Sequence, residues 1–278
     1  MSLRKIYYSL SPNLRFLARK VYYFPNDLLN SLLGKRHKYE PKQGDIYIGS
    51  GDFIKQGQEQ INMLIQHVDL QAIDRVLDIG SGIGRTALPL TEYLNEQGSY
   101  AGFDVVQKGV DWCNQGIGKD FSNFKFTYVP LNNDLYNNAA ATAERFKFPY
   151  ADNDFTKAFL FSVFTHMAVT EIENYLKEIG RVMQPEGKCL ATFFLFNAEN
   201  ADYIATENPF KFPVDKGHYK LMDEQVTAAN IAVREDKLNK MVAQTTLRID
   251  KIVYGYWRDG VEKSEENIFQ DMVVLVKK

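Results

Sequence analysis

Three glycines at alternate positions, Gly80, Gly82 and Gly84, follow the apolar run VLDI and suggest a ligand site. Glycine permits a positive φ in a tight turn and lets a ligand approach the backbone without a Cβ in the way. The spacing G-x-G-x-G differs from the G-x-G-x-x-G of dinucleotide sites. Because the carboxylate of Asp78 comes two residues before the first glycine, it would repel a pyrophosphate and attract a ligand with an ammonium group. The stretch therefore predicts a site for an amino-acid nucleoside such as S-adenosylmethionine.

The stretch VLDIGSGIGR, residues 76–85, resembles motif I of the class I S-adenosylmethionine-dependent methyltransferases. Asp104, in GFDVV, lies 20 residues after Gly84 and matches the acid that binds both ribose hydroxyls in this family. Two carboxylate oxygens suit a vicinal diol, because each oxygen can accept a hydrogen bond. The resemblance therefore implies that Asp78 faces the methionine end of the cofactor and that Asp104 holds its ribose.

Two later segments are also similar to this family. FPYADNDFTKAFLFSVFTHM (148–167) resembles the fourth-strand region, and EIGRVMQPEGKCLATFF (178–194) resembles the helix, turn and strand that follow it. In the second segment, Glu186 stands where the family's R-x-L-x-P-G-G pattern has its first glycine, at what we expect to be a surface turn. The resemblance covers residues 75–196 well and residues 226–278 loosely, and it leaves out the N-terminal segment.

The resemblance also implies a set of cofactor contacts. In the family the adenine pocket follows the third strand, here VPLNNDLYNN (129–138), where Asn132, Asn133 or Asp134 would accept a hydrogen bond from the adenine amino group. The connection to residue 148 is longer than in the family. We expect these residues to bind the cofactor: Asp78, Gly80, Ser81, Gly82, Gly84, Asp104, Val105, Asn133, Phe161 and Ser162.

His166 is the candidate catalytic residue. It follows the fourth predicted strand by one turn, where the acceptor and the transferred methyl group are expected to meet. An imidazole titrates near neutral pH, so it can take a proton from a hydroxyl acceptor. Two alternatives stay open: His166 caps the helix that begins near residue 168, or His218, in a covering loop, reaches the same site. No cluster of acids or histidines in the sequence suggests a catalytic metal.

Short, continuously apolar runs alternate with helical patterns from residue 75 onward. Strands are predicted at 75–79, 100–105, 124–129, 157–164 and 188–196, and helices at 83–96, 106–117 and 168–183. Continuous apolar strands separated by helices indicate a parallel sheet covered on both faces, and right-handed crossovers lead to a doubly wound fold. Further strands at 246–257 and 271–278 complete a mostly parallel seven-stranded α/β sheet with an antiparallel last strand.

The glycine loop joins the first strand to the first helix, at the edge where doubly wound sheets bind ligands. Pro89 falls inside the helix predicted at 83–96, and it cannot donate to the carbonyl of Arg85. A local kink or a loosened turn is therefore expected there. The side chain of Arg85 is expected to bond elsewhere, with a carboxylate as one candidate.

The chain is predicted to have two parts. Residues 1–70 form a helical cap, with one amphipathic segment from Leu14 to Val21, and residues 71–278 form the methyltransferase domain. A second amphipathic segment of the cap is predicted from Asp27 to Leu33, after Pro25.

Two further segments are expected to cover the site. A loop-like lid is expected at about 197–225, and a helix follows at about 226–246. The stretch GSGDFIKQG (49–57) is expected to close over the methionine end of the cofactor. The cap and the lid would then cover the carboxyl edge of the sheet and select the acceptor.

The charge is distributed unevenly. The formal net charge of −2 argues against a general nucleic-acid binder, but residues 1–40 carry eight Lys or Arg against two acids, which leaves −8 on the remainder. Aromatic residues accompany these cations and are expected to pack on the core; the alternative is peripheral contact with an acidic membrane. They are Tyr7, Tyr8, Tyr22, Tyr23 and Phe24.

Composition also bounds the compartment. The two cysteines, Cys113 and Cys189, have no CxxC partners, which favours a reducing environment. No apolar run approaches the length of a membrane span, and no secretory signal is evident. We therefore expect a cytoplasmic protein, and the oligomeric state stays open.

These observations lead to one expected activity and two alternatives. We expect a methyltransferase that transfers the methyl group of S-adenosylmethionine directly to a hydroxyl of a sugar or another small polar metabolite. The run S-V-F-T-H-M supports this, because it resembles bacterial small-molecule and glycan-modifying members of the family. A nicotinamide-dependent oxidoreductase is disfavoured by the glycine spacing and Asp78. A non-catalytic S-adenosylmethionine-binding protein is disfavoured by the intact glycines and Asp104.

Overall fold

The computed structural model describes residues 12–34, 36–49, 51–132, 141–224, 226 and 229–278. The helices are α2 (Pro12–Leu32), α3 (Phe53–Val68), α4 (Ala87–Tyr93), α5 (Gln107–Gln115), α6 (Ile117–Asp120), α7 (Val169–Val182), α8 (Ala201–Thr206) and α9 (Glu235–Ala243), with 3₁₀ turns η1 (Gln43–Asp45), η2 (Ala143–Arg145) and η3 (Phe164–His166). The strands are β1 (Arg75–Ile79), β2 (Ser99–Asp104), β3 (Phe124–Tyr128), β4 (Phe155–Leu160), β5 (Met183–Phe193), β6 (Leu195–Phe196), β7 (Val214–Asp215), β8 (Tyr219–Leu221), β9 (Ile231–Arg234), β10 (Leu247–Val253) and β11 (Asp271–Lys277).

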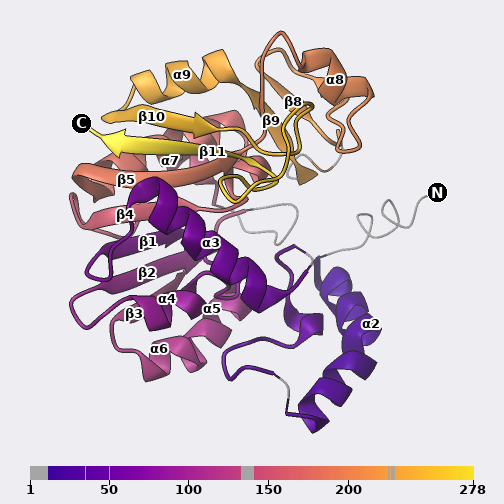
Figure 1. Cartoon of the computed structure of the whole chain (residues 1–278), viewed down its shortest axis with the longest axis vertical. Coiled ribbons are helices and arrows are strands. Elements are labelled where there is room, and N and C mark those ends of the chain that lie inside the picture. Colours follow the sequence, from indigo (N-terminus) through magenta and orange to yellow (C-terminus); the bar gives the residue numbers. More distant parts are fainter. Residues whose placement is uncertain (1–11, 35, 50, 133–140, 225, 227–228) are drawn as a thin grey trace.

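The larger sheet has seven strands in the order β10-β11-β5-β4-β1-β2-β3 (Figure 1). Its strands pair in parallel, except that β11 runs antiparallel to both β5 and β10. β1 lies between β2 and β4, and its Leu77 is in register with Ala101 on one side and Ala158 on the other. The predicted seven-stranded, mostly parallel sheet with an antiparallel last strand is confirmed.

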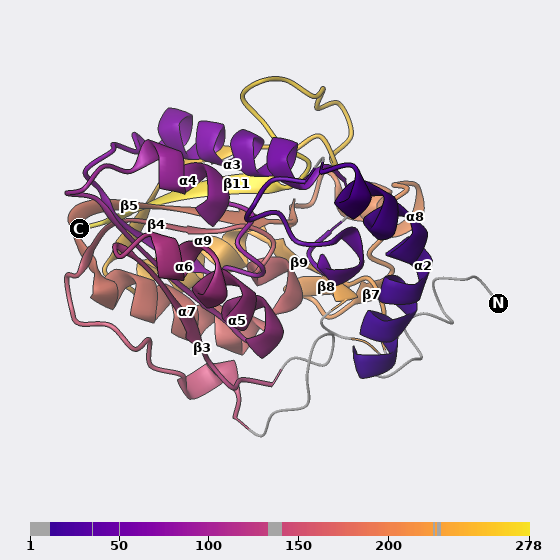
Figure 2. The ribbon, with the colours of Figure 1, turned by 90° about the horizontal axis from the view of Figure 1, so that it is seen from below.

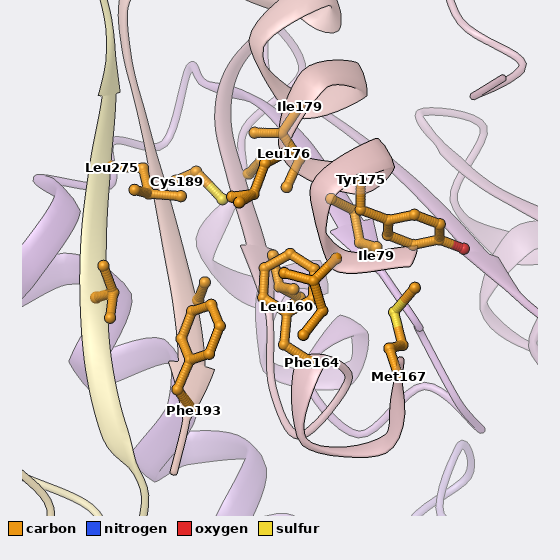
Figure 3. Packing of buried hydrophobic residues seen from close by; sticks show 14 of the residues in the cluster. Ile79, Leu160, Phe164, Met167, Tyr175, Leu176, Ile179, Cys189, Phe193 and Leu275 are labelled. Atoms are coloured by element: carbon orange, nitrogen blue, oxygen red, sulfur yellow. The ribbon is translucent and has the colours of Figure 1, made fainter. Parts of the chain in front are cut away.

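Helices cover both faces of this sheet, as Figure 2 shows. The strands alternate apolar side chains between the faces, so that Val76 packs with residues of α3, α4 and α5, whereas Leu77 packs with residues of α7 and α9. Figure 3 shows part of the apolar cluster that contains Leu77, in which Leu160 of β4 lies near Leu176 and Ile179 of α7. Burying each such side chain contributes about 1.5–3 kcal/mol, and this is what holds the strand ends in place.

A second, small sheet with the order β6-β9-β8-β7 lies beyond the carboxyl end of the large one. It packs around its own apolar cluster, which includes Phe194, Phe212 and Trp257. The segment predicted as a loop-like lid thus contains α8, β7 and β8. The helix predicted from residue 226 begins only at Glu235, because Ile231–Arg234 pairs as β9 with β6 and β8.

The buried carboxylate of Asp271 joins the two sheets. It accepts hydrogen bonds from the backbone N–H of Leu195 at 2.7 Å, the N–H of Gly255 at 2.9 Å and the indole N–H of Trp257 at 2.9 Å. Asp271 itself begins β11 of the large sheet, Leu195 belongs to β6 of the small sheet, and Gly255 and Trp257 lie in the connection after β10.

The N-terminal helix differs from the prediction of two segments. Pro12–Leu32 is a single helix that contains Pro25. Its second half is held by Asp27, whose carboxylate accepts hydrogen bonds from the N–H groups of Gln43 and Gly44 at 2.7 and 2.9 Å. Contacts with η1 therefore outweigh the helix-breaking tendency of proline here.

Two elements near the glycine loop have boundaries that differ from the prediction. α4 begins at Ala87 rather than at residue 83, so Pro89 lies in its first turn, where a missing N–H is tolerated. β4 ends at Leu160 rather than at residue 164, because Ser162 has a positive φ of 58° and Phe164 begins a 3₁₀ turn.

Candidate active site

The glycine loop connects β1 to α4 at the carboxyl end of the large sheet. Gly80, Gly82 and Gly84 all have positive φ, of 82°, 57° and 84°. A Cβ on Gly80 would lie 2.5 Å from Cγ2 of Val163, and a Cβ on Gly84 would lie 2.9 Å from Sγ of Cys113. Backbone conformation and close packing therefore both require glycine in this loop.

Hydrogen bonds fix the loop against the end of β2. The N–H of Ser81 donates to the carbonyl of Phe103 at 3.0 Å. The N–H of Gly82 donates to Oδ2 of Asp104 at 2.8 Å, and the N–H of Val106 donates to Oδ1 at 2.8 Å. Each oxygen of this carboxylate keeps further acceptor capacity, since an ionised carboxylate can accept about four hydrogen bonds.

The two acids beside the loop are buried, and their pKa values are perturbed. Burial raises the pKa of Asp78 to about 8; the Tyr100 hydroxyl, which donates to it at 2.6 Å, opposes this shift, and nearby Asp104 adds to it. Burial also raises the pKa of Asp104 to about 6. Among the described residues, no lysine or arginine is a cause of either shift. Burial therefore favours the protonated forms of both acids, and the Arg85 side chain that lines the same cavity does not offset this effect.

Both acids face a cavity of about 260 Å³ at the carboxyl edge of the sheet. Its volume is near the lower end of the range for small-molecule sites. Its walls come from the ends of β1, β2 and β4, from α7 and from the segment after η1. The lining residues are Tyr47, Ile48, Gly49, Gln60, Asp78, Ile79, Gly80, Ser81, Arg85, Thr86, Phe103, Asp104, Val105, Val106, Leu131, Asn132, Ala143, Phe161, Ser162, Val163, His166, Met167, Glu171 and Tyr175.

Most of the predicted cofactor residues are brought together in this cavity. Gly82 and Gly84 do not line it; they shape the loop, and Gly82 reaches the site through its hydrogen bond to Asp104. Asn132 lines the cavity, whereas Asn133 and Asp134 lie outside the described residues. The predicted residues that line it are Asp78, Gly80, Ser81, Asp104, Val105, Phe161 and Ser162.

His166 lies on the cavity wall that follows β4. It ends the 3₁₀ turn η3, and its N–H donates to the carbonyl of Val163 at 2.9 Å. The N-cap of α7 is Ala168, whose N–H donates to the carboxylate of Glu171 at 2.8 Å. The alternative in which His166 caps this helix therefore does not match the structure.

The other three histidines lie elsewhere. His218 is exposed in the β7–β8 hairpin, where its Nδ1 is 2.9 Å from a guanidinium nitrogen of Arg234. The structure does not bring it to the cavity. His67 is buried, with Nε2 2.9 Å from the carbonyl of Glu266, and His37 lies on the surface.

Arg85 places a buried cation at the cavity. Its guanidinium donates to the carbonyl of Ile48 and lies 5.6 Å from the centre of the Phe53 ring. Burial lowers its pKa to about 10, and nearby Arg19 adds to this effect. Gly49, the first residue of the stretch 49–57, lines the cavity. That this stretch closes over the cofactor stays a prediction.

Sequence reasoning missed the walls contributed by helices. Gln60 of α3 accepts a hydrogen bond from the hydroxyl of Thr86 at 2.7 Å, and both residues line the cavity. Glu171 and Tyr175 of α7 line it as well. Their spacing of four residues places them on one helix face, and this was the available signal.

Comparison with known proteins identifies part of the chain. Residues 77–191 match a family model described as a methyltransferase domain. The putative methyltransferase YrhH of Bacillus subtilis is 28% identical over 127 residues. That match covers 46% of this chain and 61% of YrhH, so this chain spans less than two thirds of that relative.

Solved structures share the fold at low sequence identity. The PH0226 protein of Pyrococcus horikoshii has a TM-score of 0.55 at 14% identity, over 84% of this chain and 95% of that protein. A SAM-dependent methyltransferase of Methanosarcina mazei has a TM-score of 0.52 at 20% identity, over 77% of this chain and 96% of its own. The [4+2]-cyclase SpnF also has a TM-score of 0.52, at 16% identity over 94% of both chains. The family match assigns residues 77–191 to a methyltransferase domain, and the large sheet has the Rossmann-like fold of class I S-adenosylmethionine-dependent methyltransferases.

Proposed function

We propose that the protein transfers a methyl group from S-adenosylmethionine to a hydroxyl of a small polar acceptor, such as a sugar or another metabolite. The observation that carries this proposal is that one cavity is lined by both sets of expected groups. Asp78 and Asp104 lie on the wall formed by β1 and β2, and His166 lies on the wall that follows β4.

The chemistry of the site fits the cofactor. S-adenosylmethionine carries a sulfonium and an ammonium group, and burial raises the pKa of both Asp78 and Asp104, with no lysine or arginine among the described residues as a cause that lowers it. A bound cation would favour their ionised forms and recover part of the cost of burying them. The pyrophosphate of a dinucleotide would instead add like charge, which speaks against a nicotinamide cofactor.

Arg85 complements these acids. We assign it to the methionine carboxylate of the cofactor, because its guanidinium lines the same cavity and a charged donor suits a carboxylate. Its contact with the carbonyl of Ile48 and its position by the Phe53 ring hold it in place. In this proposal the cofactor meets negative groups near its cationic end and its ribose, and a positive group at its carboxylate.

The residues of the chain then need to do little covalent chemistry. When bound, S-adenosylmethionine supplies a methyl group that is already activated by the sulfonium charge. The cavity walls orient the acceptor and exclude water. His166 takes the proton of the acceptor hydroxyl on a ring nitrogen, so that the oxygen can act as the nucleophile. The absence of an overall positive charge argues against a nucleic-acid acceptor and favours a small one.

The test is a panel of small hydroxyl acceptors, with formation of S-adenosylhomocysteine as the readout. His166→Gln is expected to lower kcat by about 10²–10⁴, the usual contribution of a general base, while the Kd for S-adenosylhomocysteine stays unchanged. His218→Gln is the matched control and should retain activity, since His218 lies outside the cavity.

Three outcomes would contradict the proposal. Full activity of His166→Gln would remove the histidine base. Binding of S-adenosylmethionine without turnover on any acceptor would favour a binding protein. Tight binding of NADH without binding of S-adenosylhomocysteine would favour an oxidoreductase.

A further inference from the structure

The helix α2 carries an apolar stripe that faces away from the rest of the described chain. The side chains of the stripe are 49% to 76% exposed and are spaced three or four residues apart, which places them on one face of the helix. Contiguous exposed apolar surface of this kind marks contact with a protein or a membrane. The α2 stripe consists of Leu14, Leu17, Val21, Phe24, Leu28 and Leu32.

The opposite, polar face of α2 is the one that contacts the body. Nε of Arg19 donates to the carbonyl of Gln43 at 3.4 Å, and Asp27 accepts hydrogen bonds from the backbone of η1. The rings of Phe16 and Tyr47 meet edge to face at 5.6 Å. An ordinary surface helix packs its apolar face inward, so this helix is inverted, and no described part of the chain covers its leucines.

Cations outnumber acids in the segment that carries the α2 stripe. Lys20 lies on α2, 3.2 Å from the carboxylate of Asp45, and Arg36 and Lys38 follow the C-terminal end of the helix, where Lys38 lies 2.7 Å from the carboxylate of Asp120. Asp27, the only acid in the α2 sequence, is turned toward η1 and bonded there. Residues 1–40 carry a net charge of +6, and the remainder carries −8. A negative surface would therefore attract this end of the molecule and repel the rest, which fixes an orientation.

We propose that α2 docks on an anionic lipid membrane, with its apolar stripe at the boundary between headgroups and acyl chains and its cations at the headgroups. Self-association of two copies through the same face would bring their cations together, which is unfavourable, so the membrane is the favoured occupant. In the part of the chain that the structure describes, no helix is long and apolar enough to cross a membrane. The helix would thus lie on the membrane.

The position of α2 relates this docking to the cavity. Figures 1 and 2 show α2 beyond the carboxyl end of the large sheet, opposite the C-terminus. The segment that follows η1 contributes Tyr47 and Ile48 to the cavity wall. Docking would hold the cavity close to the lipid surface. If the proposed methyl transfer is correct, the acceptor hydroxyl belongs to a polar group displayed at that surface; the docking itself does not depend on that activity.

The experiment is vesicle co-sedimentation of the full chain. The vesicles contain phosphatidylcholine, with or without phosphatidylglycerol. The double variant Leu17→Gln/Leu28→Gln removes apolar area and keeps good helix formers. The matched control is Ile73→Gln, because Ile73 is 57% exposed, as Leu17 is, but lies in the connection before β1, at the other end of the sheet. Calorimetric binding of S-adenosylhomocysteine checks that each variant is folded.

The wild-type protein is expected to partition about tenfold more strongly into the anionic vesicles, and the double variant should lose about tenfold of that affinity. High salt should weaken binding, since the screening length falls from about 10 Å at 0.1 M to about 3 Å at 1 M. Ile73→Gln should bind as the wild type does. Equal binding of both variants, no preference for anionic lipid, or an α2-dependent dimer without vesicle binding would overturn the proposal.

Discussion

Replacing Asp104 by alanine is expected to weaken the binding of S-adenosylhomocysteine by about 5- to 150-fold. This carboxylate accepts backbone N–H groups of Gly82 and Val106 at 2.8 Å, and its two oxygens keep acceptor capacity for the ribose hydroxyls. Loss of hydrogen bonds to a charged acceptor costs about 1–3 kcal/mol, and each 1.4 kcal/mol corresponds to tenfold in Kd. Isothermal titration calorimetry measures this change directly.

The same substitution also removes the acceptor for the Gly82 N–H, so part of the loss could come from a disturbed loop. Adenosine and 2′,3′-dideoxyadenosine separate the two effects. The wild-type protein should bind adenosine about 5- to 150-fold more tightly than 2′,3′-dideoxyadenosine, because only adenosine has the ribose diol. Asp104→Ala should bind both nucleosides with nearly equal affinity.

Two results would refute this reasoning. An unchanged Kd for S-adenosylhomocysteine would show that Asp104 does not contact the ligand. An equal preference for adenosine in both proteins would show that the diol is bound by other groups. Asp250→Ala, on the exposed strand β10, is the control for removing a carboxylate and should leave both affinities unchanged.

Two further predictions follow from the acids and the loop. Burial raises the pKa values of Asp78 and Asp104 to about 8 and about 6, so these groups contribute to the stability of the ligand-free protein at low pH, and this contribution is lost as pH rises through these values. Over the same pH range S-adenosylmethionine should bind more tightly, by at most tenfold per pH unit for each group. Calorimetric measurement of the Kd from pH 5.5 to 8.5 checks this pH dependence. Asp78→Asn should remove the change in Kd near pH 8, and an equally steep change in this variant would contradict the prediction. Gly80→Ala should lower the thermal midpoint more than Gly217→Ala, because both glycines have φ near 80° but only the new Cβ at residue 80 meets a neighbour, Val163. Both substitutions cost about 1–2 kcal/mol because alanine disfavours the left-handed conformation. Equal thermal midpoints of the two variants would show that the contact with Val163 adds no further destabilisation.

The central strands could be predicted from sequence because they are buried on both faces. Four of the five residues of β1 are buried, and β4 ends in the buried apolar run 158–160. The end of β4 could not be predicted, since it depends on the positive φ of Ser162, a residue without a special preference for it. Glu186 likewise has a φ of 63°, at the position where the family pattern has glycine. The glycine of the pattern indicates this left-handed conformation, which the glutamate in this sequence does not.

The second sheet and the inverted helix could not be predicted for a different reason. β9 is only four residues long, and its pairing with β6 and β8 depends on residues far away in the sequence. The apolar spacing of α2 predicts a buried face, but its polar contacts with η1 turn that face outward. Local periodicity identifies which residues share a face and does not show what that face meets.

Within the candidate site, the glycine loop and its two acids were predictable because their residue types and spacing follow from the strand–loop–helix geometry. The partner of Arg85 could not be predicted, because its hydrogen bond to the carbonyl of Ile48 joins residues 37 positions apart in the sequence. The placement of His166 in the cavity and of His218 outside it depends on tertiary structure. Residue type alone therefore could not choose between the two histidines.

The most direct test of the account is a crystal structure of the protein with S-adenosylhomocysteine. We expect the ribose hydroxyls within hydrogen-bonding distance of the Asp104 carboxylate, the methionine ammonium group near Asp78, and the ligand backbone against Gly80. A glycine loop closed off by side chains, or density for a phosphate-bearing compound between the two acids, would contradict the account.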